Sequence, residues 1–135
     1  MAAPRRTAAP KPSADPFERA RAFCLALPEV TERPSHGEPA FFVKGKLFAT
    51  FSMNHHHDEE EALWIKAAPG VQEMLIDEDP DHFFRPPYVG VSGWVAARMD
   101  RKAIPWDDIE ALIRDAWVLA APKRLAATLT VPPDG

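Results

Sequence analysis

The sequence predicts an α+β protein in which helices cover mainly one face of an antiparallel sheet. The first observation is that two apolar runs, residues 40–43 and 46–51, are separated only by Lys44-Gly45. A two-residue turn with glycine in second place is typical of a β-hairpin. The second observation is an apolar stripe at helical spacing in residues 106–120, with acidic residues near its start. This stripe predicts a helix that packs on the sheet.

Length, charge and cysteine content bound the class of protein. A chain of 135 residues suits one domain, and a formal net charge of -4 gives no overall basic field that would attract nucleic acid or an anionic membrane. The single cysteine, Cys24, lies among apolar residues, which indicates a buried thiol in a reducing compartment. Because no apolar run reaches the roughly 18 residues of a membrane span, we expect a soluble, monomeric, cytoplasmic protein.

The expected order begins with a polar tail and one helix. The predicted division is a disordered tail, one domain and a flexible C-terminus, at residues 1–14, 15–129 and 130–135. Asp15 is suited to cap a helix and Pro16 to occupy its first position. Apolar residues then recur at helical spacing until Pro28 ends the pattern.

The middle of the chain predicts strands around a second helix. Residues 30–39 contain two prolines and a glycine, so we expect a shaped connector there and not a central strand. The expected hairpin register pairs Val43 with Lys46, Phe42 with Leu47 and Phe41 with Phe48. Further strands are expected at residues 62–65, 83–85 and 93–99, a helix at 69–76, and added helical turns at 123–129. The predicted order is helix, three strands, helix, two strands, helix.

Residues 35–49 resemble the signature region of the MmcQ/YjbR family. They read Ser-His-Gly-Glu-Pro-Ala-Phe-Phe-Val-Lys-Gly-Lys-Leu-Phe-Ala. Three further segments agree with the family in order and spacing, and they lie at residues 24–31, 87–95 and 106–121. Together these segments span roughly residues 16–125, so the resemblance covers the whole domain. It implies a secretion-chaperone-like fold and DNA binding through hairpins arranged as a double wing.

A DNA-binding role would use cations and aromatic side chains near the strands. Cations neutralise phosphates and aromatic rings can stack on bases. The candidates are Lys44, Lys46, Lys66, Arg85, Tyr88, Trp94, Arg98, Arg101 and Lys102. The alternative for the lysines is that they keep hairpin turns and strand ends soluble. The alternative for the protein is a binding module for a small molecule or a protein partner.

The loop at residues 54–61 departs from the family pattern. It carries His55, His56 and His57, followed by four carboxylates. Imidazole and carboxylate groups suit a transition metal, but adjacent residues in one loop rarely converge on one ion. We therefore expect adventitious metal capture, with no specific metal site and no cofactor. The carboxylates would also repel phosphates if this loop approached DNA.

His36 and Glu38 are the candidates for a ligand cleft. His36 lies beside Gly37 in the expected connector, where a backbone can present a side chain to a cleft. A general base needs a partner within hydrogen-bond reach, and the sequence identifies none. We therefore expect no enzyme activity and a structural role for His36. Among the tryptophans, Trp94 is expected to be exposed near the last hairpin, whereas Trp64, Trp106 and Trp117 are expected to face inward.

Overall fold

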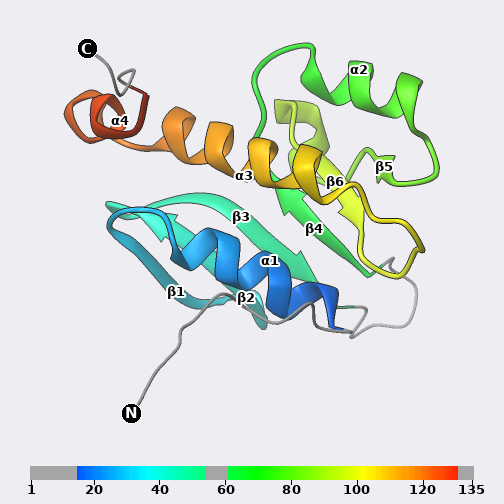
Figure 1. Cartoon of the computed structure of the whole chain (residues 1–135), viewed down its shortest axis with the longest axis horizontal. Helices are drawn as coiled ribbons and strands as arrows, with labels where there is room; N and C mark the ends of the chain where they lie inside the picture. Colours follow the sequence, from blue (N-terminus) through cyan, green and yellow to red (C-terminus); the bar gives the residue numbers. More distant parts are fainter. Residues whose placement is uncertain (1–14, 54–60, 131–135) are drawn as a thin grey trace.

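The structure is a computed structural model that describes residues 15–53 and 61–130 (Figure 1). It is an α+β fold with one antiparallel sheet, which confirms the predicted fold class. The helices are α1 Pro16–Leu25, α2 Val71–Glu78, the 3₁₀ helix η1 Val89–Ser92, α3 Trp106–Ala120 and α4 Lys123–Thr130. The strands are β1 Val30–Ser35, β2 Glu38–Val43, β3 Lys46–Ser52, β4 Ala62–Ile65, β5 Phe83–Phe84 and β6 Val95–Arg98.

The sheet contains six strands in the order β1-β2-β3-β4-β6-β5. The segment that we expected to be a connector is the edge strand β1, so this part of the expectation was wrong. Val30 pairs with Val43 at one end of β1, and Pro34 pairs with Pro39 near the other. Proline lacks a backbone donor and is therefore confined to sheet edges. The prolines exclude a central position but not a strand.

Both hairpins that involve β2 turn through two residues with positive φ. Lys44 and Gly45 have φ values of 50° and 80°, and His36 and Gly37 have 54° and 83°. Positive φ at both central residues is the conformation that matches the twist of paired strands, and glycine adopts it without steric cost. The Lys44-Gly45 hairpin is therefore present as expected.

The β2–β3 register follows the expectation for two pairs and then shifts. Val43 pairs with Lys46 and Phe42 with Leu47, but Phe41 pairs with Ala49 instead of Phe48. The extra residue forms a β-bulge, which reverses the facing of the rest of β3. As a result Phe51 lies against Phe41 on the helix side, with ring centroids 5.3 Å apart.

α1 and α3 cover one face of the sheet and enclose the core (Figure 1). The side chain of Asp15 caps α1, because its Oδ1 accepts a hydrogen bond from the backbone N–H of Phe17 at 3.0 Å. On α3, Trp117 is fully buried and its Nε1 donates to the Pro28 carbonyl at 2.9 Å. This bond joins α3 to the segment that leads from α1 into β1.

The remaining helices lie around this core. α2 contacts the short strand β5 and buries Leu75, which belongs to the same apolar cluster. α4 begins after Pro122 as a separate helix and packs on α3 through Ala126. None of the helices in the described ranges is long and apolar enough to cross a membrane. The expected tail, the 54–60 loop and the end of the C-terminus lie outside the described residues.

Candidate functional site

The two faces of the sheet are built differently. The helix-side cluster includes Phe41, Val43, Leu63 and Val95 but none of the side chains that alternate with them. Those side chains lie on the opposite face, which we call the uncovered face. The strand register assigns to it Thr31, Arg33, Ser35, Glu38, Ala40, Phe42, Leu47, Thr50, Ser52, Ala62, Trp64, Phe84, Ala96 and Arg98. No described helix belongs to this layer.

Two arginine–phenylalanine stacks flank Trp64 on the uncovered face. The guanidinium carbon of Arg33 lies 4.1 Å from the centroid of the Phe42 ring, toward the β1 edge. On the other side, the guanidinium of Arg98 lies 4.5 Å from the centroid of Phe84. Both distances fit a cation–π interaction, which holds the guanidinium planes over the rings. The face therefore presents planar groups on both sides of a central indole.

The indole N–H of Trp64 has no acceptor among the described residues. Its Nε1 atom is buried, and its cross-strand neighbours are Thr50 on β3 and Ala96 on β6. A buried donor without an acceptor costs roughly 1–3 kcal/mol. The ring is half-buried, and the fully buried Ala40, Ala62 and Ala96 lie in the same layer. Small side chains between large rings give this layer its shape.

Among the residues that the structure describes, cations outnumber carboxylates on the uncovered face. Arg33 and Arg98 lie on this face. Lys66 directly follows β4 and continues its pairing with β3, because the Lys66 N–H donates to the Phe48 carbonyl at 3.0 Å. By strand alternation Lys66 lies on the same side as Trp64. The carboxylate on this face is Glu38, whose Oε2 accepts from the Met53 N–H at 3.2 Å. Three cations against one carboxylate give a local positive charge on a chain whose net charge is -4.

The hairpin-tip candidates do not form a pair of neighbouring wings. Lys44 and Lys46 are exposed at one end of β2, and the Nζ of Lys44 lies 3.3 Å from Glu29 Oε1. The other described turn, at His36, lies at the opposite end of β2 because the two hairpins share that strand. The tips therefore point away from each other.

The candidates around β5 and β6 separate into exposed and buried groups. Arg85 and Tyr88 are exposed, but Trp94 is only 7% exposed, so its expected exposure was wrong. Trp94 immediately precedes β6, and α2 is held against this segment because the Trp94 carbonyl accepts a hydrogen bond from Gln72 at 2.6 Å. Trp94 has no free ring face to offer a base.

The last two candidates lie on the segment between β6 and α3. The Nη1 atom of Arg101 is 3.1 Å from the carboxylate of Asp100. The carbonyl of Lys102 lies 2.8 Å from Nε2 of His82, and the Lys102 side chain is exposed. Neither residue belongs to the uncovered face.

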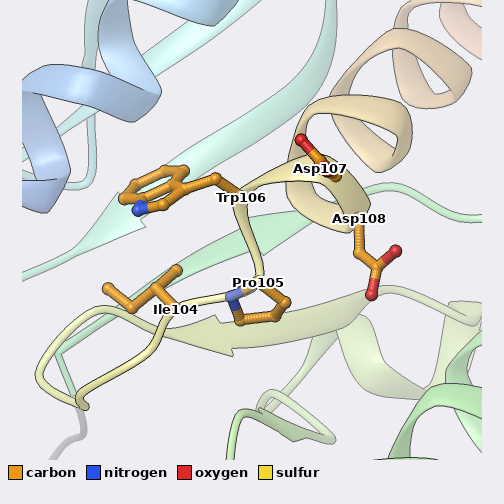
Figure 2. Close-up of a pocket in the computed structure, with 5 residues that line it drawn as sticks. All are labelled: Ile104, Pro105, Trp106, Asp107 and Asp108. Carbon is orange, nitrogen blue, oxygen red and sulfur yellow. The ribbon is translucent and has the colours of Figure 1, made fainter. Parts of the chain in front are cut away.

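His36 and Glu38, the candidates for a ligand cleft, lie at and next to the turn between β1 and β2. His36 is exposed at its turn, and the carboxylate of Glu38 bonds to the backbone of Met53. A surface pocket of about 470 Å³ lies elsewhere, at the start of α3, where its lining is Ile104, Pro105, Trp106, Asp107 and Asp108 (Figure 2). Its two carboxylates point in opposite directions (Figure 2). This arrangement provides no paired acid and base.

Metal and thiol chemistry receive no support from the described residues. His55, His56 and His57 lie outside them, so the metal expectation stays untested. Within residues 15–53 and 61–130, no three His, Cys, Asp or Glu side chains gather in a group that could hold a metal ion. Cys24 is fully buried, and burial raises the pKa of its thiol, with a smaller contribution from Glu32.

Comparisons with known proteins agree with the resemblance noted in the sequence. The YjbR family model matches residues 25–119 of the chain. The chain belongs to the YjbR family. This YjbR-family chain also resembles the crystal structure of Deinococcus radiodurans protein DR2400, described as a DUF419 domain, with a TM-score of 0.67 and 20% identity. The match covers 86% of this chain and 88% of that one. No protein with a curated description matches the chain.

The sequence prediction missed the two arginine–phenylalanine stacks of the uncovered face. Arg33 was placed in a connector, and Phe42 and Phe84 were treated as apolar strand residues without an arginine against their rings. The two-residue spacing of Thr31 and Arg33 would place both side chains on the same face of a strand. A strand prediction for this segment would have placed Arg33 beside the hairpin aromatics.

Proposed function

We propose that this YjbR-family protein binds nucleic acid, including DNA, through the uncovered face of its sheet. The observation that carries the proposal is the pair of arginine–phenylalanine stacks on either side of Trp64. Nucleic acids offer phosphates to cations and flat bases to aromatic rings and guanidinium planes. The uncovered face combines both kinds of group in one layer.

Three features favour the sheet face over the hairpin tips as the contact surface. The described tips lie at opposite ends of β2. Lys44 is close to a carboxylate, which offsets its charge toward a phosphate. The loop after β3 carries four carboxylates in sequence, which would repel the backbone of DNA. The DNA-binding role is therefore kept, but the proposed contact surface is the uncovered face of the sheet and not a double wing of hairpins.

The proposal treats the protein as a monomeric, cytoplasmic binding module without catalytic activity. The lining of the pocket at the start of α3 contains no Ser, Thr, Cys, His or Lys side chain, and its two carboxylates diverge. A protein or a small molecule is the competing kind of ligand for the uncovered face. The charge on that face favours a polyanion, because three cations lie in the same layer as one carboxylate.

The test is a charge reversal on the uncovered face with a matched control. The double variant Arg33→Glu/Lys66→Glu removes two cations of this face, whereas Lys123→Glu/Arg124→Glu makes the same change in net charge on α4, on the helix side. Binding of fluorescein-labelled single-stranded and duplex DNA is measured by anisotropy over a range of salt concentrations. The salt slope is the slope of the logarithm of the binding constant against the logarithm of the salt concentration. Removing one cation that neutralises a phosphate reduces the magnitude of this slope by roughly 1.

We expect the double variant on the uncovered face to bind at least about tenfold more weakly, with a salt slope lower by about 2. The changes in affinity and in salt slope of the α4 control, relative to the parent, should be less than half of those of the variant on the uncovered face. Equal effects of the two double variants would show that only net charge matters and would overturn the proposed surface. Absence of binding by the parent protein to either DNA at low salt would overturn the function itself.

A further inference from the structure

The loop between β5 and β6 holds Tyr88 in a strained backbone conformation. Tyr88 has φ 65° and ψ -74°, and the N–H of Val89 donates to the Pro87 carbonyl at 2.7 Å. These values define a γ-turn with positive φ at its centre, a rare and strained conformation for a residue with a side chain. The Tyr88 side chain is 85% exposed. Strain is therefore combined with almost full exposure of a large aromatic ring.

Hydrogen bonds from α2 and buried neighbouring residues hold this loop in place. Gln72 of α2 donates from Nε2 to the carbonyls of Gly90 and Trp94, at 2.8 and 2.6 Å. Pro86 is fully buried. Gly90 has no room for a side chain, because a Cβ there would lie 2.6 Å from Cγ of Arg85. These contacts tie the loop to α2, and Tyr88 is a large side chain that the loop presents to solvent.

One end of this loop carries a residue of the sheet layer that we propose as the binding surface. Phe84, at the start, is stacked under Arg98 on the uncovered face. Trp94, at the end, is buried but lies outside the helix-side core cluster. Tyr88 is four residues from Phe84 in the sequence, in the loop that joins β5 to β6.

The form of the surface selects the kind of nucleic acid. In a duplex the base faces are stacked on each other, and a sheet face too broad for the grooves reaches only the backbone. Unpaired bases can turn outward and stack on aromatic side chains or on arginine planes. The rings on β2, β4 and β5 span four strand spacings, which is about 19 Å at roughly 4.8 Å per spacing. This length suits several unpaired nucleotides.

We propose, resting on the function proposed above, that the ligand is a single-stranded nucleic acid and that Tyr88 stacks on one of its bases. A surface of stacked rings and guanidinium groups binds any base sequence, since each base offers a flat face. The class of ligand is therefore single-stranded DNA or RNA with little sequence preference. Tyr88 contributes affinity, and its strained turn is retained because it fixes the ring in the binding position.

The experiment compares a labelled 12-nucleotide oligothymidylate with a labelled 12-base-pair duplex at the same salt concentration. We expect the parent protein to bind the single strand at least about tenfold more tightly. Tyr88→Ala should weaken single-strand binding by roughly 5- to 150-fold, the range that corresponds to one stacked base. Tyr88→Trp should retain binding, and Val91→Ala, a truncation of another exposed side chain of the same loop, should leave it within twofold.

Tyr88→Gly separates a binding role from a structural one. Glycine adopts positive φ without strain, so this variant should melt at the same temperature as the parent or higher. Its single-strand affinity should nevertheless fall as far as that of Tyr88→Ala. A fall in melting temperature together with affinity would overturn the role of Tyr88 as a binding residue.

The outcomes distinguish the two proposals. Binding of the duplex as tightly as the single strand would overturn the single-strand inference and leave the nucleic-acid function standing. Tight single-strand binding that Tyr88→Ala does not change would overturn only the role of Tyr88. Binding of neither oligonucleotide would overturn the function on which this inference rests and leave a protein or small molecule as the ligand.

Discussion

The imidazole of His82 lies 2.8 Å from the backbone carbonyl of Lys102 through Nε2. On its other side, Nδ1 lies 3.0 Å from a carboxylate oxygen of Asp79. Carbonyl and carboxylate oxygens only accept hydrogen bonds, so both ring nitrogens must carry a proton to satisfy both contacts. This arrangement joins the end of α2 to the segment before α3 and favours the charged imidazolium.

The first prediction concerns the pH dependence of this contact. The bond to Lys102 raises the pKa of His82 most, Asp79 and Asp81 raise it further, and burial opposes them. Because the folded-state pKa is raised, the stabilisation is complete below the ordinary value near 6.5 and is lost as pH rises through the raised value. We expect His82→Gln to lower the free energy of unfolding by about 1–2 kcal/mol at pH 5.5 and by less at pH 8.5.

Urea unfolding at the two pH values measures this difference. His36→Asn is the control, because it removes an exposed imidazole from a turn whose positive φ asparagine tolerates. A loss of stability in His82→Gln that is the same at pH 5.5 and pH 8.5 would contradict the charged form of His82.

The second prediction concerns the thiol of Cys24. The side chain is fully buried in the core, and desolvation raises its pKa, so little thiolate forms at neutral pH. We expect no reaction with a thiol-specific disulfide reagent in the native protein over several minutes. After addition of denaturant one equivalent should react, since the sequence contains one cysteine. Rapid native labelling would show that α1 separates from the sheet.

The third prediction compares two tryptophans that differ in hydrogen bonding. Trp117→Phe removes a buried indole and leaves the Pro28 carbonyl without its donor at 2.9 Å. We expect a loss of about 2–3 kcal/mol in the free energy of unfolding. Trp64→Phe removes a buried N–H that has no acceptor among the described residues. Its cost should be about 1 kcal/mol or less, because the substitution breaks no hydrogen bond.

Chemical denaturation of the two variants measures this comparison directly. Circular dichroism is the appropriate signal, because each substitution changes the tryptophan fluorescence. An equal or larger loss in Trp64→Phe would indicate that its indole N–H finds an acceptor outside the described residues.

The fourth prediction concerns the stack between Arg33 and Phe42. The guanidinium lies 4.1 Å from the ring centroid on an exposed edge strand. A cation–π contact at an exposed site contributes about 0.5–1 kcal/mol. Arg33→Ala and Phe42→Leu should therefore show a coupling free energy of this size in a double-mutant cycle. Arg33→Ala with Lys123→Ala, on α4, is the control pair, and its coupling should be close to zero.

The sequence predicted the fold class and the β2–β3 hairpin because both depend on local signals. Two apolar runs separated only by Lys44-Gly45 leave little choice of turn, and α3 carries a full apolar stripe. The strand β1 was missed because an edge strand needs no apolar face and tolerates Pro34. The bulge after Leu47 was missed because Phe48 and Ala49 are both apolar, so the sequence does not indicate which of them is the extra residue.

The candidate site was harder to predict because it is made by pairing between strands. Arg33 reaches Phe42 across the β1–β2 ladder, and Arg98 reaches Phe84 across the β5–β6 ladder. Neither contact is visible without the correct register. Trp94 was expected to be exposed because it follows Gly93, but the bond from Gln72 to the Trp94 carbonyl depends on the docking of α2. Tertiary packing decided both cases.

The two outer strands of the sheet determine how copies of this molecule can approach each other. β1 carries Pro34, which lacks a backbone donor, and β5 consists only of Phe83 and Phe84. Neither border offers a long row of unpaired amides onto which another strand could be added. Growth of the sheet into an aggregate is therefore discouraged at both borders, even though the interior strands are rich in phenylalanine.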